Sequence, residues 1–196
     1  MPEQGDLGFG PAPRQPSVVR SANPAGDRAT PAPGGGVRPG SARSYIIRTD
    51  GAARGNPGPA SAGAVLIDAG RADARLPNAP ADVSISDFLG HQTNNVAEYT
   101  AVVRALDLAR ELGAREVHLL LDSKLIVEQL HGRWRVKDAK LIPLWTAARG
   151  TLAGFERWSA AHVPRAQNSS ADRLANEAID RVRAGGPPSV VVRPGG

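Results

Sequence analysis

The sequence predicts an α/β domain, built as a mixed sheet with helices on its faces. Short apolar runs of strand length come first as a group of three, and further such runs then alternate with segments whose apolar residues recur at helical spacing. Consecutive strands favour an antiparallel meander, whereas strands separated by helices favour parallel pairing. The apolar run Val117–Leu121 is typical of a strand that is covered on both faces.

The chain of 196 residues is long enough for one domain with a hydrophobic core. Residues 1–43 are rich in Gly, Pro, Ala and Arg and bury too little apolar surface to offset the entropy of ordering, so we predict a disordered tail. Two interpretations of this segment stay open: it is a solvated tail, or its arginines contact nucleic acid. Residues 184–196, which include Gly-Gly-Pro-Pro, are predicted to be a second disordered tail. The folded domain is therefore expected to span residues 44–183.

The first three strands are predicted at Tyr45–Asp50, Ala62–Ile67 and Val83–Leu89. The first is β-branched and aromatic, and it ends at a carboxylate followed by Gly51. A turn rich in Gly and Pro separates the first two strands, and the polar segment Gly70–Asp82 is predicted to be a loop before the third.

The remaining elements begin with a long helix at Val96–Leu112, where apolar residues recur every three or four positions and Gly113 supplies the stop. After the strand Val117–Leu121, the chain is expected to form a short helix and then an irregular basic segment. The later elements are a helix, a strand and a final helix, predicted at Leu141–Leu152, Arg157–Val163 and Ser170–Val182.

Composition excludes several kinds of site. The chain has no cysteine, which excludes disulfides and thiolate metal sites and favours a reducing compartment. Its four histidines are scattered without paired spacing, which disfavours a zinc site. No run of about 18 apolar residues and no signal-peptide core is present, so we expect a cytoplasmic protein. The 24 Lys and Arg against 19 Asp and Glu are compatible with a polyanionic partner.

Four acids stand at the ends of predicted elements. Asp50 and Asp122 close strands, and Glu98 and Asp172 lie in the first turns of helices. Ligands of open α/β sheets bind outside the carboxyl ends of the strands. Glu98 shares the sheet-facing side of its helix with apolar residues, so its carboxylate is expected to point inward. The sequence therefore predicts that the four carboxylates meet at one rim of the sheet.

Each acid also has a purely structural explanation. Glu98 and Asp172 each fit a capping box, Asp122 fits an N-cap, and Asp50 fits the start of a turn. Taken together, however, several carboxylates in a partly dry site repel one another unless cations lie among them. Oxygen ligands without His or Cys select Mg²⁺ or Mn²⁺. Two such ions, about 3.5–4 Å apart, are suited to hydrolysis of a phosphodiester.

Polar residues flank the predicted site on two sides. The Gly-rich turn after Asp50 is not a phosphate-binding P-loop, because Pro57 and Pro59 lack N–H donors and no Gly-Lys-Ser/Thr follows. It offers Arg54 and Asn56 instead. The segment Thr93-Asn94-Asn95 offers three polar side chains at a helix N-terminus, where either capping or phosphate binding is favoured.

The chain from about Tyr45 to Val182 resembles ribonuclease HI, in the branch of the family that lacks a basic protrusion. Four motifs carry the resemblance, in the family's order and spacing, and together they are highly specific. They are Thr49-Asp50-Gly51 with Gly55-Asn56-Pro57-Gly58, then Thr93-Asn94-Asn95-Val96-Ala97-Glu98, then Leu121-Asp122-Ser123, and finally His162-Val163-Pro164-Arg165 leading to Asn168 and Ala171-Asp172-Arg173-Leu174-Ala175.

The resemblance implies a ribonuclease H-like fold, a five-stranded sheet of three antiparallel and two parallel strands with helices on both faces. It implies two Mg²⁺ ions, for which Mn²⁺ can substitute, and cleavage of the RNA strand of an RNA/DNA hybrid. The implied metal ligands are Asp50, Gly51 through its carbonyl, Glu98, Asp122 and Asp172. The implied substrate-binding residues are Asn56, Asn94 and Asn95 in the minor groove and Thr93 at a DNA phosphate. We also expect substrate contacts from Gly51, Arg54 and Asn168.

Two features depart from the family's usual pattern. The segment that joins the two central helices, Gly132–Lys140, is short, although it stays basic. Its Trp134, together with Trp145, is predicted to pack rather than stack on a ligand. The family often has a product-releasing His on a flexible Gly-rich loop. Here Arg165 is predicted to take this part, and His162 stays a second candidate.

The sequence therefore predicts an endoribonuclease that acts on RNA/DNA hybrids. We expect it to act as a monomer without an obligate protein partner or membrane contact. Two alternatives stay open, a non-catalytic nucleic-acid-binding module on the same fold and a nuclease of relaxed specificity that also cuts double-stranded RNA. A dead homologue usually loses one of the four acids, and all four are present here.

Overall fold

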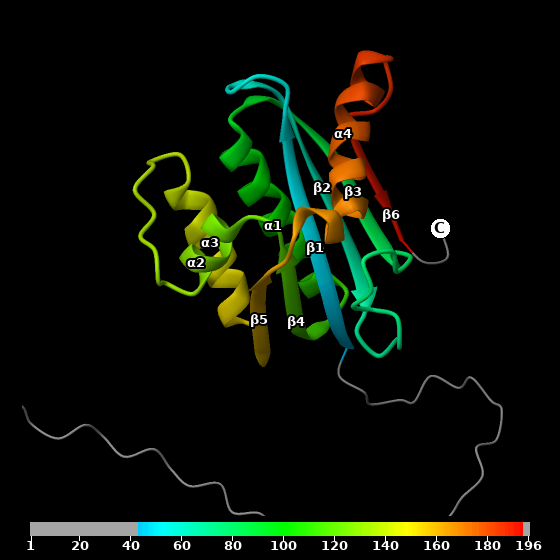
Figure 1. The fold of residues 1–196 in the computed structure, drawn as a ribbon, viewed down its shortest axis with the longest axis vertical. Coiled ribbons are helices and arrows are strands. Elements are labelled where there is room, and N and C mark those ends of the chain that lie inside the picture. Colours follow the sequence, from blue (N-terminus) through cyan, green and yellow to red (C-terminus); the bar gives the residue numbers. More distant parts are fainter. Residues whose placement is uncertain (1–42, 194–196) are drawn as a thin grey trace, which may run out of the picture. The chain divides into compact units, whose positions relative to one another are not determined.

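The computed structural model describes residues 43–193 and shows an α/β sheet with helices on both faces (Figure 1). The predicted N-terminal tail lies outside the described residues, except for Arg43, which begins the first strand. No helix in residues 43–193 is both long enough and apolar enough to cross a membrane. The elements are β1 Arg43–Ala53, β2 Gly58–Asp68, β3 Val83–Gln92, α1 Asn94–Glu111, β4 Ala114–Leu121, α2 Lys124–Leu130, α3 Ile142–Ala153, β5 Arg157–His162, the 3₁₀ turn η1 Arg165–Gln167, α4 Ser169–Arg183 and β6 Ser189–Val192.

The strands form one sheet in the order β5-β4-β1-β2-β3-β6. Neighbouring strands from β1 to β3 are antiparallel, and β1, β4 and β5 run parallel to one another. The predicted meander and the two parallel strands are confirmed. The predicted number of five strands is wrong, because β6 adds a sixth strand antiparallel to β3.

The predicted disorder of residues 184–196 is wrong over Ser189–Val192, which form β6. The returning chain is held by Arg181, whose Nε donates to the Pro187 carbonyl at 2.7 Å and whose Nη1 donates to Ser86 Oγ at 2.9 Å. The Phe88 amide donates to the Pro188 carbonyl at 2.7 Å. A free β3 edge therefore recruits this short segment, even though its Gly-Gly-Pro-Pro start resembles a flexible tail.

Deleting residues 187–196 is expected to destabilise the domain by about 1–3 kcal/mol, because the hydrogen bonds to Arg181 and the β3 edge are lost together. Urea unfolding of the two chains measures the difference. Val192→Ser is the matched control, because this exposed side chain contributes little burial and leaves the strand pairing intact. Equal unfolding midpoints for the deleted and the full chain would show that β6 adds no stability.

The two faces of the sheet are covered by different helices. On one face, α1 packs over β1 and β2 and against α3, and Ile47, Leu66 and Leu119 lie in the core beneath them. On the other face, α4 packs over β1, β2 and β3, and Leu174 lies with Ile46 and Val65 in a smaller core. Since neighbouring positions of a strand face opposite sides, β1 supplies side chains to both cores.

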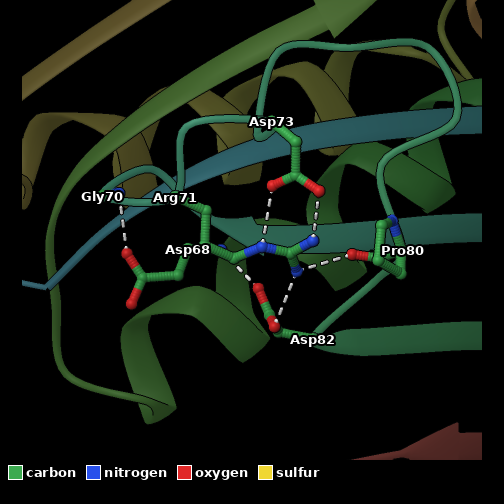
Figure 2. A network of polar contacts seen from close by, with 6 residues as sticks. All are labelled: Asp68, Gly70, Arg71, Asp73, Pro80 and Asp82. Carbon is green, nitrogen blue, oxygen red and sulfur yellow. Dashed lines mark hydrogen bonds and ion pairs between the residues drawn. The ribbon is translucent and has the colours of Figure 1, made fainter. Parts of the chain in front are cut away.

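The loop between β2 and β3 extends the smaller core, and an arginine clamp holds it in shape (Figure 2). Arg71 donates to both carboxylate oxygens of Asp73, at 3.0 and 2.8 Å, to Asp82 at 2.9 Å and to the Pro80 carbonyl at 2.8 Å. Asp82 also accepts a hydrogen bond from the Asp68 amide at 2.7 Å. Ala74 and Ala79, which lie between these anchors, are buried against the sheet.

Candidate active site

The four predicted acids line one hollow of about 460 Å³, at the end of the sheet where β1 and β4 finish. The parallel register pairs Ile47 with Leu119, so Asp50 and Asp122, each three residues further on, lie side by side. Asp122 directly follows β4, whereas β1 continues past Asp50 to Ala53. Glu98 enters from the second turn of α1, one turn later than predicted, and Asp172 enters from the first turn of α4. The predicted convergence of the four acids is therefore found in the structure.

Two glycines bring both helices close to the sheet at this point. A Cβ atom on Gly51 would lie 2.2 Å from the Glu98 amide nitrogen, and one on Gly63 would lie 2.2 Å from the Ala171 carbonyl oxygen. Gly63 is also the β2 partner of Asp50. Without side chains at these two positions, α1 and α4 approach β1 and β2 from opposite faces, and Glu98 and Asp172 reach the rim where Asp50 lies.

Asp50 is the most deeply placed of the four acids, with 8% of the residue exposed. Its Oδ1 accepts a hydrogen bond from the Gly51 amide at 2.9 Å. Burial, followed by the charges of Asp122, Asp172 and Glu98, raises the pKa of Asp50 to about 8, and the Arg165 charge opposes this rise. In this environment, any added positive charge strongly favours the ionised form of Asp50 over the protonated form.

Glu98 is held by side chains rather than by a capping box. Thr93 occupies the N-cap of α1 and accepts from the Val96 amide, so the Asn95–Glu98 box does not form. Asn94 Nδ2 donates to Glu98 Oε1 at 2.8 Å, and Ser123 supplies a second side-chain hydrogen bond. Burial raises the pKa of Glu98, and these hydrogen bonds limit the rise.

The other two acids are also free of the capping roles that the sequence leaves open. Ser123 is the N-cap of α2, and Asp122 instead accepts from Asn168 Nδ2 at 2.8 Å. Asn168 is the N-cap of α4, so the Ser169–Asp172 box is absent. Asp172 accepts from Arg165 Nη2 at 2.7 Å, an ion pair whose arginine side chain is 79% exposed. Such an exposed pair is weak and easily exchanged, so it does not remove Asp172 from the ligand set.

The predicted role of Asn168 as a substrate contact is wrong. The residue is completely buried, and its Nδ2 donates both to the Thr49 carbonyl and to Asp122, each at 2.8 Å. Asn168 therefore joins β1, β4 and the start of α4 beneath the carboxylates. The sequence pattern shows a polar residue near the last acid, but it does not show on which side of the chain that residue lies.

Other predicted residues fall in or around the hollow. Gly51, Asn94 and Arg165 line it. The remaining predicted residues, Arg54, Asn56, Thr93, Asn95 and His162, are not among its lining residues, and His162 is exposed at the end of β5.

Two of these outlying residues have partners of their own. Arg54 is engaged by Asp180 through both terminal nitrogens, at 2.7 and 2.9 Å. Asn56 is exposed, and its Oδ1 accepts from the Asn94 amide at 3.2 Å.

Two polar lining residues were missed as site residues. Ser123 follows Asp122, and Asn176 lies one helical turn after Asp172, with its Nδ2 3.3 Å from the Asp172 carboxylate. The spacing of four residues on a helix would have identified Asn176.

Trp134 is 46% exposed, which contradicts its predicted packing, and Lys124 Nζ lies 6.0 Å from its ring centroid. Trp145 is partly buried, as predicted, and its Nε1 donates to the Gln129 carbonyl at 3.0 Å. A second hollow of about 480 Å³ lies between the two rings, with Arg133 and Arg135 at its border.

The donors at the rim fit a hard divalent cation. They are carboxylate oxygens without sulfur or nitrogen ligands, and burial, followed by repulsion from the other three acids, raises the pKa of Asp50. In residues 43–193, no three Asp, Glu, His or Cys side chains stand at the spacing needed to hold one ion. The four carboxylates therefore share the hollow, and side-chain rotation is needed to close them around a cation.

The sequence of this chain is similar to a protein-family model and to known ribonucleases. Residues 48–178 match the family model described as "Reverse transcriptase-like". The chain is 32% identical over 151 residues to ribonuclease H of Thiobacillus denitrificans and covers 94% of that protein. The chain belongs to the ribonuclease HI family. This confirms the resemblance that the four motifs indicate.

Other members of the ribonuclease HI family are more similar in sequence. The chain is 45% identical over 135 residues to the bifunctional protein Rv2228c of Mycobacterium tuberculosis, and this match covers 69% of the chain and 35% of that protein. It is 44% identical over 131 residues to ribonuclease HI of Halobacterium salinarum, with coverages of 67% and 62%. The chain therefore spans about a third of the first of these relatives and less than two thirds of the second.

Solved structures of ribonuclease H domains superimpose on this chain. The N-terminal RNase H domain of Rv2228c superimposes with a TM-score of 0.64 at 44% identity, covering 70% of this chain and 99% of that one. LC11-RNase H1, solved in complex with an RNA/DNA hybrid, superimposes with a TM-score of 0.63 at 37% identity, with coverages of 71% and 99%.

Proposed function

We propose that this ribonuclease H domain is an endoribonuclease that hydrolyses the RNA strand of RNA/DNA hybrids with the help of two Mg²⁺ ions. The observation that carries the proposal is the meeting of Asp50, Glu98, Asp122 and Asp172 in one hollow, from four separate elements. Membership of the ribonuclease HI family and the similarity to a hybrid-bound relative support the same substrate class.

The four carboxylates and the Gly51 carbonyl would hold the metal ions. When bound, such ions activate the attacking water and stabilise the leaving oxygen of a phosphodiester. The protein's own contribution is to fix the ligands. Asn94 and Ser123 orient Glu98, and Asn168 orients Asp122. These hydrogen bonds limit the rotation of both carboxylates within the hollow that they line.

Arg165 adds positive charge at the mouth of the hollow. Its Nη2 is bound to Asp172, and the rest of its exposed guanidinium is free to face the solvent side. In the proposed complex these remaining N–H groups donate to a phosphate oxygen, where charge-assisted hydrogen bonds are strong. Arg165 is therefore assigned the part in product release that the sequence leaves between it and His162.

Recognition of the hybrid is assigned to the polar residues near the N-terminus of α1. Asn94 lines the hollow, Asn56 is bound to the Asn94 backbone, and Asn95 is exposed beside them. Amide side chains at this place suit the minor groove, where 2′-hydroxyls distinguish RNA from DNA. The basic segment after α2, which carries the exposed Trp134, is assigned contacts to phosphates, so affinity is expected to fall as salt rises.

A cleavage assay with labelled substrates tests the proposal. We expect the wild-type chain to cut RNA/DNA hybrid with Mg²⁺ and to lose activity in excess EDTA. Glu98→Gln should abolish cutting. The control is Glu111→Gln, which should cut normally because Glu111 lies at the other end of α1 and interacts with Arg193. Duplex RNA and duplex DNA in parallel reactions measure the substrate range. Binding of hybrid without cutting, under any metal condition, would favour a non-catalytic module.

A further inference from the structure

Arg48 is a charged side chain placed where charges are rarely found. It lies on β1, two residues before Asp50 on the same side of the strand, and is 1% exposed. Burial lowers the pKa of its guanidinium, and no carboxylate contributes to the shift. Its Nε has no hydrogen-bond partner within residues 43–193. A buried arginine without a carboxylate is unfavourable unless its position serves another purpose.

The two hydrogen bonds that Arg48 does make connect two distant segments. Nη1 donates to the Gln167 carbonyl at 2.7 Å, and Nη2 donates to the Arg75 carbonyl at 2.9 Å. Gln167 ends the 3₁₀ turn η1, which begins at Arg165 and is followed directly by Asn168. Arg48 therefore holds, from the buried side, the short segment that carries the two residues bound to Asp172 and Asp122.

The second hydrogen bond brings the β2–β3 loop into the same network. The Arg71 clamp fixes Asp73 and Pro80 (Figure 2). Arg75 lies between these two residues in the chain, so the clamp restrains the part of the loop that carries the Arg75 carbonyl. Arg71 is partly exposed, whereas Arg48 is buried. Hydrogen bonds, together with the loop backbone between Asp73 and Pro80, thus connect the Arg71 clamp through Arg48 to the 165–168 segment.

We propose that Arg48 is a positioning residue, which fixes the 165–168 segment so that Arg165 and Asn168 hold their carboxylates, and that the β2–β3 loop supports it through the Arg75 carbonyl. This inference rests on the proposed function for its effect on catalysis. Its structural part is independent of that function. Arg48 touches neither the hollow nor the substrate, so it should affect turnover and leave substrate affinity unchanged.

Two variants of Arg48 test the positioning role. Arg48→Met keeps the length of the side chain but donates no hydrogen bond, so kcat should fall about tenfold or more while KM stays unchanged. Arg48→Lys keeps the charge and bonds to one carbonyl, so it should recover part of the loss and serves as the second variant if the first does not fold. Arg71→Met, which releases the loop without touching β1, should lower kcat to a smaller extent.

Hydrogen exchange of the metal-free protein gives a readout that does not need cleavage. The amides of Gln167 and Asn168 donate within the segment, to Pro164 and Arg165, each at 2.8 Å. Arg48→Met should speed their exchange at least about tenfold relative to the amides of β4. Ile85→Ala is the matched control. It removes a buried side chain from the core beneath α1, on the other face of the sheet, and leaves the contacts of the 165–168 segment intact.

The outcomes separate the two proposals. If the wild-type chain does not cleave hybrid, the function is wrong, and the exchange comparison alone decides the role of Arg48. If Arg48→Met loses no more kcat and gains no more exchange at Gln167 and Asn168 than Ile85→Ala does, Arg48 serves general stability and the positioning role is overturned.

Discussion

Replacing Asp50 by asparagine is expected to reduce cleavage of RNA/DNA hybrid at least about 1,000-fold. The four acids act as one unit, so removing one of them should cost nearly as much activity as removing all four. Asp50 lies deepest in the hollow and interacts with all three other acids. Asparagine has the same shape but no charge, so the fold and the contacts to nucleic acid should persist. Cleavage rates and hybrid affinity, measured side by side, check both halves of this expectation.

The same variant should be more stable than the wild-type chain when metal is absent and the pH is high. The folded-state pKa of Asp50 is about 8, above the ordinary value of 3.8, so the folded state binds a proton that the unfolded state releases. The stability of the wild type should therefore decrease as the pH rises from about 4 to about 8. Asp50→Asn removes this dependence, and unfolding in EDTA at pH 5 and pH 9 measures it.

Asp107→Asn on α1 is a suitable control, because this half-buried acid interacts with Arg110 and Thr151 away from the hollow. It should cut hybrid at the wild-type rate. Addition of Mg²⁺ should raise the unfolding temperature of the wild type and of this control, and raise that of Asp50→Asn much less. Full activity of a folded Asp50→Asn protein would overturn the assignment of the site.

Replacing Asn168 by alanine is expected to have the second largest effect. The change leaves the Thr49 carbonyl and the Asp122 carboxylate each without a donor, which should destabilise the domain by about 1–3 kcal/mol. Asp122 then loses its fixed orientation, and kcat should fall about 10- to 100-fold. Because Asn168 is buried and does not meet the substrate, KM should change little.

Gln167→Ala is the matched control for Asn168→Ala. Its side chain is exposed, and the interaction that Gln167 makes with Arg48 uses its backbone carbonyl, which alanine retains. Kinetics and urea unfolding of both variants separate the two residues. A kcat for Asn168→Ala equal to that of Gln167→Ala would show that the hydrogen bond to Asp122 has no part in the reaction.

Most of the fold could be predicted from the sequence, because its local signals agree with one another. The short helix expected after the strand Val117–Leu121 is found at Lys124–Leu130, and the loop before β3 lies where its polar residues indicate. The β1 strand was predicted too short, since pairing with β2 carries it on through Gly51 to Ala53. Strand β6 was missed, because its order depends on the free edge of β3 and on Arg181, which no pattern within the segment reveals.

The four acids could be predicted because each lies close to the end of a strand or the start of a helix, and topology then brings these places together. The residues that hold the acids could not be predicted in the same way. Asn168 and Arg48 are polar residues whose partners are backbone carbonyls of remote segments. A carbonyl can be offered by any residue type, so such partners leave no signature in the sequence.

Gly51 and Gly63 decide the scale of the catalytic centre. Where other parts of the domain are separated by interlocking side chains, here main chain rests directly on main chain. The backbone positions of the opposing acids are therefore fixed by packed main chain. Only the torsions of the carboxylate side chains are left to adjust when an ion enters, so the reorganisation that binding requires stays small and local.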